Sequence, residues 1–240
     1  MAKIKDSNPK SSSGGYLRII GNEKLSDIFV KAQSTVISAG SELEKLVTKN
    51  AKCIENLDKF INEYDEGKIE EGSYLCPKKV ISDSKYKLKE HEPDFLIIKV
   101  AHPGMCYVIE LKDGDNFDTK KSVSEKEHLK EFATHISSLV PFRAKYYICC
   151  FNQDDKKKIV AGFKKKFTED EVITGKELCN LLGINYDDIV KDREKDTLEN
   201  FQYIVNEVSN IPEVKNKVNQ EQKKIVSSPD FYEEDEENNS

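Results

Sequence analysis

The sequence predicts an α/β fold in which a mixed central β-sheet is flanked by helices. Two runs rich in β-branched and aromatic residues, 94–100 and 105–112, stand on either side of Ala101-His102-Pro103-Gly104. A turn of this composition between two such runs predicts an antiparallel hairpin. Segments with the apolar spacing of helices come before and after the hairpin, and a third apolar run follows at 142–151. Helices that alternate with strands in this way are typical of α/β proteins.

The chain before the hairpin begins with a polar segment and continues with a long helical pattern. Residues 1–15 are rich in Lys and Ser, so we expect a flexible arm. From about Lys24 to Glu63, apolar residues recur at steps of three and four, as on one face of a helix. Gly40 is expected to break or bend this helix near its middle. Residues 66–91 mix Gly, Pro and Ser with short apolar pieces, which predicts a loop with one weak strand.

The chain after the hairpin carries a capping signal and a strongly apolar run. Ser122 and Glu125 match a capping box ahead of a helix that extends to about Leu139. The run 142–151 is apolar on both faces, as in strands that are covered on both sides, so it predicts a central strand. A Lys-rich hairpin or loop is expected to follow it.

The C-terminal part of the chain is expected to be mainly helical. Thr174 and Glu177 match a second capping box, ahead of a helix that continues through Leu182. The pattern then stays helical to about Ile211, and the sequence beyond is polar. No internal repeat is present, and no second domain is indicated.

These elements predict one domain between two polar ends. The domain covers residues 16–225, with its core at about 35–155 and a C-terminal helical part at about 170–215. The last segment, 226–240, is expected to be an acidic disordered tail. Six acids and no base lie in the last eleven residues, and the net charge of the whole chain is −6. The rest of the chain is therefore neutral overall, so its charge does not exclude a DNA-binding cleft.

Composition narrows the class of protein further. No run approaches the roughly 20 apolar residues of a membrane span. The N-terminus lacks the apolar stretch of a secretion signal, so we expect a cytoplasmic protein without a membrane partner. The six cysteines form no C-x-x-C pair and lie mostly in apolar runs, so we expect buried, reduced thiols and no structural zinc site.

The residues that carry chemistry lie at the ends of the two hairpin strands. Asp94 begins one strand, and Glu110 lies near the end of the next. The short turn should bring these ends side by side, so that both carboxylates reach one Mg²⁺ ion, a metal that takes oxygen ligands and keeps several waters. Lys112 points to the same face as Glu110, because side chains alternate along a strand. There it could orient or deprotonate a water that attacks a phosphodiester. A solvent-face Glu–Lys ion pair and a Pro-Asp turn are the structural alternatives.

This arrangement resembles the PD-(D/E)XK nuclease superfamily, with Pro93-Asp94 and Glu110-Leu111-Lys112 as its two half-motifs. The expected hairpin, the helix after it and the central strand follow in the αβββαβ order of the restriction-endonuclease-like core. The resemblance covers roughly residues 35–155. It implies Mg²⁺ as the cofactor, with Mn²⁺ able to substitute.

A third acid is suggested upstream of the half-motifs. Gly40-Ser41-Glu42-Leu43-Glu44 resembles the Gly-x-x-x-Glu element with which many members of this superfamily add an acid. The resemblance therefore implies Glu44 as a third catalytic and metal-binding residue beside Asp94 and Glu110. Glu42 is the alternative candidate for this acid. The structural alternative is that Glu44 is an ordinary charged residue on the helix surface.

The loop after the second half-motif suggests contacts to DNA. Residues 113–122 resemble the segment that several type II restriction enzymes show directly beyond the catalytic lysine. The resemblance implies that Thr119, Lys120, Lys121 and Ser122 bind the DNA backbone, helped by the N-terminus of the following helix.

Two other features remain open. The clusters 156–158 and 164–166 each hold three lysines, which could follow phosphates or form an ordinary Lys-rich surface. His91 lies three residues before Asp94 and could support the site, although an exposed loop histidine is the other interpretation.

Among the functions of this superfamily, a type II restriction endonuclease is predicted. The length suits a homodimer in which each subunit cuts one strand of a short palindrome in double-stranded DNA. Such an enzyme pairs functionally with a cognate DNA methyltransferase. A Holliday-junction or DNA-repair nuclease with the same core is the alternative, and a catalytically silent DNA-binding relative is a third.

Overall fold

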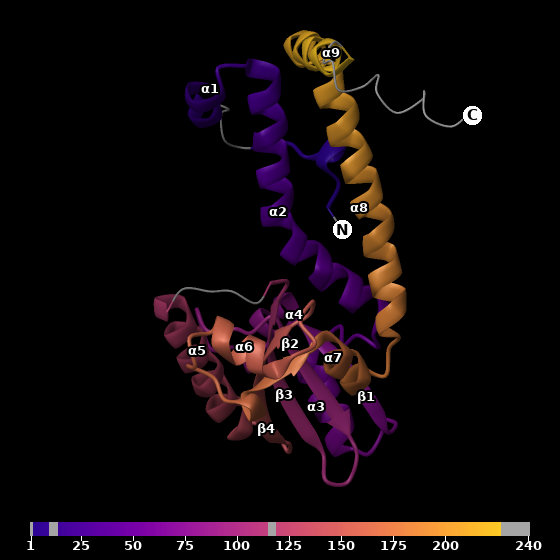
Figure 1. Cartoon of the computed structure of the whole chain (residues 1–240). Coiled ribbons are helices and arrows are strands. Elements are labelled where there is room, and N and C mark those ends of the chain that lie inside the picture. The colour runs from indigo at the N-terminus through magenta and orange to yellow at the C-terminus, as the bar shows by residue number, and fades with distance from the viewer. Residues whose placement is uncertain (1, 10–13, 115–118, 227–240) are drawn as a thin grey trace, which may run out of the picture. The chain divides into compact units, whose positions relative to one another are not determined.

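The computed structural model describes residues 2–9, 14–114 and 119–226, which form two compact units (Figure 1). The sheet unit consists of residues 38–193, and the helical unit of residues 1–37 and 194–240. The segment 226–240 is expected to be an acidic tail, and all of it except Val226 lies outside the described residues. The prediction of a single domain over 16–225 stays a prediction, because a division into compact units does not tell whether each folds alone.

The sheet unit is built on one five-stranded mixed sheet. Its strands lie in the order of the sequence. They are β1 (Gly72–Pro77), β2 (Phe95–Val100), β3 (Met105–Lys112), β4 (Arg143–Cys150) and β5 (Val172–Thr174). β1, β2 and β3 are antiparallel neighbours, whereas β4 and β5 continue the sheet parallel to β3. The predicted hairpin and the predicted mixed sheet are therefore confirmed, and β1 is the weak strand expected within 66–91.

Helices cover both faces of this sheet. One face packs against α3 (Leu57–Asp65), α5 (Thr119–Ser137) and α6 (Lys156–Gly162). The other face packs against the C-terminal half of α2 (Glu23–Asn50) and against α7 (Gly175–Leu182). The short helix α4 (Lys78–Ser82) joins β1 to the chain before β2. The order of helix, three strands, helix and strand is that of the predicted αβββαβ core, so the restriction-endonuclease-like fold is confirmed.

Side chains alternate between the two helical layers, as the strand geometry requires. Along β3, Cys106 and Val108 face α5, while Ile109 and Leu111 face α2 and α7. Five of the six cysteines are buried, as expected, whereas Cys53 is exposed.

The helical pattern before the sheet forms two helices, and the break between them falls later than the break or bend that the sequence predicts at Gly40. α2 continues through Gly40 to Asn50, and α3 is a separate helix that starts at Leu57. A glycine inside a helix costs about 1 kcal/mol, which the packing of the flanking turns outweighs. The break falls after Asn50 because the next residues pair with β1: the N–H of Ile54 donates to the carbonyl of Leu75 at 2.8 Å.

Two further local predictions are wrong. α5 begins at Thr119, so Ser122 lies inside the helix and does not cap it. The Lys-rich segment is the helix α6, not a hairpin or loop. Its N-cap is Asp155, whose side chain accepts a hydrogen bond of 2.9 Å from the N–H of Lys157, and its apolar Ile159 is buried.

The second capping box is confirmed. The N–H of Glu177 donates to the hydroxyl of Thr174 at 3.2 Å, and the N–H of Thr174 donates to the Glu177 carboxylate at 2.9 Å. α7 then ends at Gly183, which adopts the left-handed conformation (φ 68°) that a glycine tolerates.

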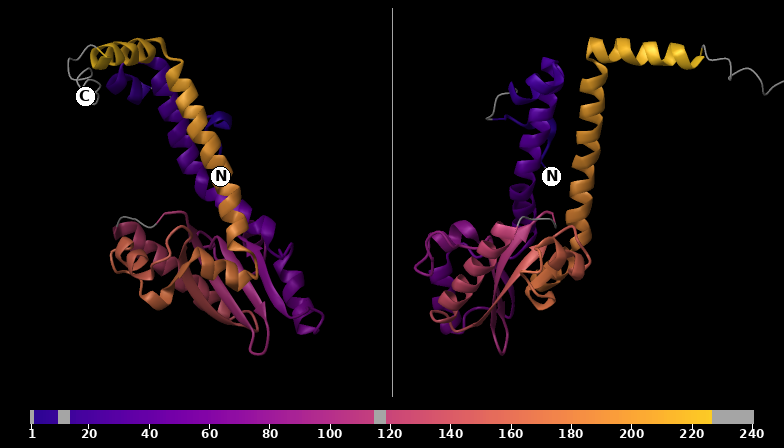
Figure 2. Two further views of the ribbon diagram at one scale, coloured as in Figure 1. Left: turned by 45° about the vertical axis from the view of Figure 1, so that its right-hand side comes forward. Right: turned by 60° about the vertical axis from the view of Figure 1, so that its left-hand side comes forward.

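The helical unit contains α1 (Gly14–Ile20), the N-terminal part of α2, most of α8 (Tyr186–Ser209) and α9 (Pro212–Val226). α2 and α8 run side by side (Figure 2), and Lys31 Nζ lies 3.3 Å from the hydroxyl of Tyr203. Part of the segment expected as a flexible arm packs here: Ile4 is buried, and its N–H donates to Asn200 Oδ1 at 2.7 Å. In the described parts of the chain, no helix is long and apolar enough to cross a membrane.

The packing of α7 on β4 yields a first prediction. A Cβ at Gly175 would overlap the carbonyl oxygen of Phe151, whereas a Cβ at Gly40 would meet no atom within 4 Å. Gly175→Ala should therefore lower the free energy of unfolding by roughly 1–3 kcal/mol. Gly40→Ala, the matched control, should raise it by up to about 1 kcal/mol because alanine favours a helix. Urea unfolding measures both changes, and equal effects of the two substitutions would contradict the close contact.

Candidate active site

The end of the hairpin away from its turn brings the two half-motifs together. Phe95 pairs with Ile109, and this register, extended by one residue, sets Asp94 opposite Glu110. Asp94 is buried, and its Oδ2 accepts a hydrogen bond of 2.9 Å from the N–H of Leu111. The two carboxylates that the sequence places at adjoining strand ends therefore lie beside each other.

Burial perturbs both of these carboxylates. It raises the pKa of Asp94 above its ordinary value. Burial, together with the neighbouring charge of Asp94, raises the pKa of Glu110 to about 8. Lys78, at the start of α4, lies 3.9 Å from Asp94 (Nζ to Oδ1), and its backbone N–H donates to the carbonyl of Asp94 at 2.9 Å. Because this ion pair is long, it compensates the negative charge of the buried acids only weakly.

Lys112 lies beside the acid pair and links it to α5. Its Nζ donates to Glu110 Oε1 at 2.6 Å and to Glu125 Oε1 at 2.8 Å. Burial alone would lower the pKa of Lys112, but the two carboxylates raise it above its ordinary value. The lysine is therefore held as a cation between two acids from different elements.

A hydrogen-bonded network fixes the end of β3 that carries Lys112. Arg193 donates to Asp113 Oδ1 at 2.6 Å and to Asn152 Oδ1 at 2.9 Å, and Asn152 donates in turn to Asp113 Oδ1 at 2.6 Å. The N–H of Phe151 donates to the carbonyl of Lys112 at 2.9 Å. The strand end is thus held from the end of β4 and the start of α8.

A second network fixes the turn of α5 that carries Glu125. Lys126 donates to Glu171 Oε2 at 2.6 Å, and the hydroxyl of Tyr146 donates to the other carboxylate oxygen. Burial would raise the pKa of Glu171, but these hydrogen bonds lower it to about 2. α5 is therefore attached to β4 directly next to the residue that contacts Lys112.

The upstream acid lies on the part of α2 that packs on the sheet. Burial raises the pKa of Glu44, and the charge of Asp94 raises it further. Glu42, the alternative, instead forms a surface ion pair with Lys45 at 2.6 Å. Glu44 is therefore close enough to Asp94 for their charges to interact.

A cavity of about 440 Å³ opens onto Glu110, Lys112 and Glu125. Two stacked imidazoles help to line it: His91 and His128 have ring centroids 4.2 Å apart. His91 Nδ1 also lies 2.7 Å from Glu131 Oε2. His91 is therefore packed against α5 at the edge of the site and is not a free loop residue.

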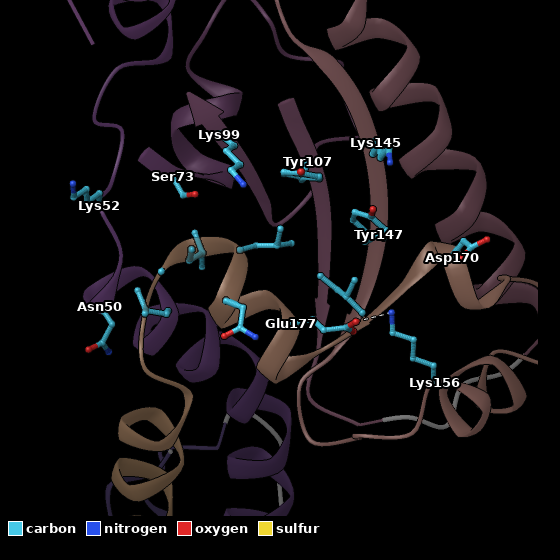
Figure 3. A pocket seen from close by; sticks show the side chains of 16 residues that line it. Asn50, Lys52, Ser73, Lys99, Tyr107, Lys145, Tyr147, Lys156, Asp170 and Glu177 are labelled. Atoms are coloured by element: carbon cyan, nitrogen blue, oxygen red, sulfur yellow. Dashed lines mark ion pairs between the residues drawn. The ribbon is translucent and has the colours of Figure 1, made fainter. Parts of the chain in front are cut away.

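A larger cavity of about 830 Å³ lies on the opposite face of the sheet (Figure 3). The side chains that β2, β3 and β4 contribute to it are lysines and tyrosines (Lys99, Tyr107, Lys145 and Tyr147). Its two carboxylates, on Asp170 and Glu177, come from separate elements, and Lys156 pairs with the second at 2.7 Å. This cavity offers no neighbouring carboxylates, so we place the candidate active site in the smaller one.

The expected DNA-binding residues at the start of α5 fall largely outside the described side chains. This applies to Thr119, Lys120 and Lys121, whose backbone begins the helix. Ser122 is fully buried in α5 and lines the smaller cavity. A DNA contact by these four residues stays a prediction.

The two lysine clusters lie at the two ends of α6. Lys156 is paired with Glu177, while Lys157 and Lys158 are exposed. Residues 164–166 follow the helix and are also exposed, with the carbonyl of Lys166 accepting from Lys126 at 3.0 Å. Both interpretations of the clusters, phosphate contact and ordinary surface, stay open.

The acid pair suits a Mg²⁺ ion. Asp94 and Glu110 are buried carboxylates, each at a raised pKa, so a divalent cation beside them would relieve their mutual repulsion. No three His, Cys, Asp or Glu side chains of the described residues converge on one metal position. Mg²⁺ does not need such a cluster, because it binds through one or two carboxylates and keeps waters or phosphate oxygens as its other ligands.

Three residues of the site were not assigned to it from the sequence. The sequence predicts Glu125 as part of a helix cap, Lys78 in a loop and Arg193 in a helix remote from the motifs. For Lys78 and Arg193 the sequence holds no signal, because only the fold brings them to the strand ends. For Glu125 the signal is its position on the helix that directly follows the half-motifs.

The raised pKa of Glu110 predicts how the stability of the metal-free protein changes with pH. The folded state binds this proton more tightly than the unfolded state, because the pKa is about 8 in one and 4.5 in the other. The resulting stabilisation is complete below about pH 4.5 and is lost as the pH rises through 8. Glu110→Gln should remove this contribution to the pH dependence and raise the urea midpoint above pH 8.

Urea unfolding in EDTA at several pH values measures this effect. Glu42→Gln, which removes an acid outside the buried pair, is the control and should keep the dependence of the wild type. An unchanged pH profile in Glu110→Gln would show that another group is responsible.

Comparison with known proteins supports a relationship over nearly the whole chain. The sequence is 48% identical over 223 residues to the type II restriction enzyme HhaII of Haemophilus parahaemolyticus, an alignment that covers 91% of this chain and 98% of that enzyme. No family model matches the sequence, and no solved structure matches it. With this identity and coverage, the chain belongs to the family of type II restriction enzymes that includes HhaII.

Proposed function

We propose that this protein is a Mg²⁺-dependent type II restriction endonuclease of the PD-(D/E)XK superfamily. It hydrolyses a phosphodiester bond in each strand of double-stranded DNA at a short palindromic site. The observation that carries the proposal is the grouping of Asp94, Glu110 and Lys112 at adjoining strand ends beside a cavity. The relationship to the restriction enzyme HhaII supports the same class of reaction.

Asp94 and Glu110 are the residues that would hold the metal, with Glu44 near enough to add its charge. When bound, Mg²⁺ would polarise the scissile phosphate and make a water more acidic. Asp94 is aimed by the N–H of Leu111, and Glu110 is aimed by Lys112, so both carboxylates are oriented before any ligand arrives. Preorientation of this kind lowers the cost of assembling the reacting groups.

Lys112 acts as a cation in this arrangement and not as a base. Its raised pKa keeps the proton on Nζ, where it can donate to a phosphate oxygen or to the attacking water. Glu125 holds the ammonium from the α5 side, so Lys112 can keep one partner while it turns toward the DNA. Glu125 is therefore a positioning residue for Lys112.

Cleavage of both strands implies two centres, because one centre hydrolyses one strand at a time. A homodimer with twofold symmetry supplies the second centre and matches a palindromic site. A restriction enzyme of this kind also requires a cognate DNA methyltransferase to protect the DNA of the cell.

Digestion of plasmid DNA tests the proposed function. With Mg²⁺ or Mn²⁺, linear duplex should give discrete fragments with both strands cut at fixed positions, and EDTA should stop the reaction. Ca²⁺ should permit binding without cutting. Cleavage that persists in chelator would contradict the metal mechanism. Symmetric cutting of four-way branches with no cutting of plain duplex would instead identify a junction nuclease, and binding without cleavage under all conditions a silent relative.

Single substitutions test the residues. Asp94→Ala, Glu110→Ala and Lys112→Ala should each lower the single-turnover rate of cleavage by at least about 10³-fold, because charge stabilisation at the phosphate supplies several kcal/mol. Glu44→Gln should also slow cleavage, whereas Glu42→Gln, its matched control on the same helix, should cut at the rate of the wild type. If Lys112→Ala cleaves DNA at nearly the wild-type rate, the ion pair between Lys112 and Glu110 has only a structural role.

A further inference from the structure

The larger cavity, on the face of the sheet that carries α2 and α7, has no part in the proposed reaction. Its volume is about 830 Å³, and it shares no lining residue with the smaller cavity at Lys112. Tyr107 and Glu110 lie three positions apart on β3, so they point to opposite faces of the sheet. All the lining residues belong to the sheet unit. The cavity is therefore a second concave site, on the other side of the sheet from the candidate active site.

The floor of this cavity is the sheet, and its walls come from the helices that cover the rest of that face (Figure 3). One wall is the end of α7 with the residues that follow it, 180–184, and another is the end of α2 with Lys52 beyond it. The floor lies where this helical cover stops. Its side chains come from β2, β3 and β4 and are those of Lys99, Tyr107, Lys145 and Tyr147.

The floor carries positive charge that the described residues do not neutralise. Lys99 and Lys145 are exposed, and within the described ranges neither forms an ion pair. Arg143 lies two positions before Lys145, and so on the same face of β4, and it is exposed as well. The residues that line the cavity include four lysines and two acids, and Glu177, one of the acids, is already held by Lys156 at 2.7 Å. This excess of cations around a concave site favours an anionic ligand.

Two tyrosines lie among these cations. Tyr107 and Tyr147 are half-buried, and their ring centroids are 6.0 Å apart. Tyr107 stands opposite Lys145 in the strand register. Burial raises the pKa of Tyr107 and Tyr147 raises it further, while the charge of Lys145 lowers it, so the lysine is close enough to act on the phenol. Aromatic rings beside lysines are the pattern that binds single-stranded nucleic acid, with bases stacked on the rings and phosphates next to the cations.

We propose that this cavity binds a short stretch of single-stranded DNA. The bases lie against Tyr107 and Tyr147. The phosphates contact Lys99 and Lys145. This site goes beyond the proposed function, because none of its residues serves the candidate active site and the strand it binds is not the duplex to be cut.

The arrangement of the cations and rings favours a single strand over other anions. A duplex keeps its base faces stacked inside the helix, so it would leave the tyrosines without a partner. An acidic peptide would also use the lysines alone. A free nucleotide holds its phosphates in one place, whereas Lys99 and Lys145 stand on strands two spacings apart, roughly 10 Å. A single strand supplies both several bases and several separated phosphates.

Fluorescence anisotropy of a labelled oligo(dT) of about fifteen nucleotides, titrated with the full chain in EDTA, tests the proposal. The wild type should bind it. Lys99→Gln combined with Lys145→Gln should weaken binding at least roughly tenfold and reduce the slope of log affinity against log salt by about 1.4, because each phosphate contact of a single strand contributes about 0.7. Lys59→Gln combined with Lys130→Gln is the matched control. It removes two exposed lysines from α3 and α5, on the opposite face, and should bind as the wild type does.

A second pair of variants tests the stacking. Tyr107→Leu keeps an apolar side chain at this half-buried position but removes the ring, so it should weaken binding of oligo(dT) about tenfold. Tyr107→Phe keeps the ring and should bind as the wild type does. Circular dichroism checks that both variants keep the fold. Both also keep the catalytic residues, so they should cut plasmid DNA at the wild-type rate.

The possible results separate this site from the proposed function. A wild type that does not bind oligo(dT), or equal binding by the Lys99/Lys145 variant and its control, would overturn the site and leave the nuclease function standing. Displacement of oligo(dT) by equimolar ATP would assign the cavity to a free nucleotide, and displacement by equimolar poly-glutamate would assign it to an acidic peptide, so either result would overturn the proposal. Oligo(dT) binding that Tyr107→Leu weakens, in a protein that cuts no plasmid, would support the site and contradict the nuclease function.

Discussion

Asp94 lies opposite Glu110 because Phe95 pairs with Ile109, and this one register decides which side chains reach the candidate site. A shift of a single residue would turn every side chain of β3 to the opposite face of the sheet. Glu110 and Lys112 would then face α2 and α7, and Ile109 would leave the apolar core that it shares with those helices. The burial of the core therefore enforces the geometry of the site, although the core residues take no part in the chemistry.

The same register brings more acidic side chains than basic side chains into the buried site. Asp94, Glu110 and Glu125 gather around Lys112, and Lys78, a second lysine of the described residues, remains 3.9 Å from Asp94 (Nζ to Oδ1). Buried carboxylates that lack full compensation raise their pKa values, as burial does for Asp94 and Glu110. A fold selected for stability alone would replace such a group with apolar residues. In the proposed function, a cation that arrives with the substrate would supply the missing positive charge.

The sequence predicts the parts of this site that depend on local pattern. The hairpin follows from two apolar runs around a turn, and with it the position of Asp94 beside Glu110. What the sequence does not predict depends on distant residues. α2 passes through Gly40 and ends at Asn50, because the segment beyond it pairs with β1. Glu125 reaches Lys112 because Lys126, the next residue, is held by Glu171 some forty-five positions later in the chain. Contacts between residues so far apart in the sequence are set by the fold, and no sequence motif indicates them.

The division into two units suggests how one chain can serve a reaction that needs two. Among the described residues, the two carboxylates that contact Lys112, Glu110 and Glu125, belong to the sheet unit, so in the proposed function each chain would carry its own centre. The second copy that the proposed function calls for would then supply its own centre and set the distance between the two cuts.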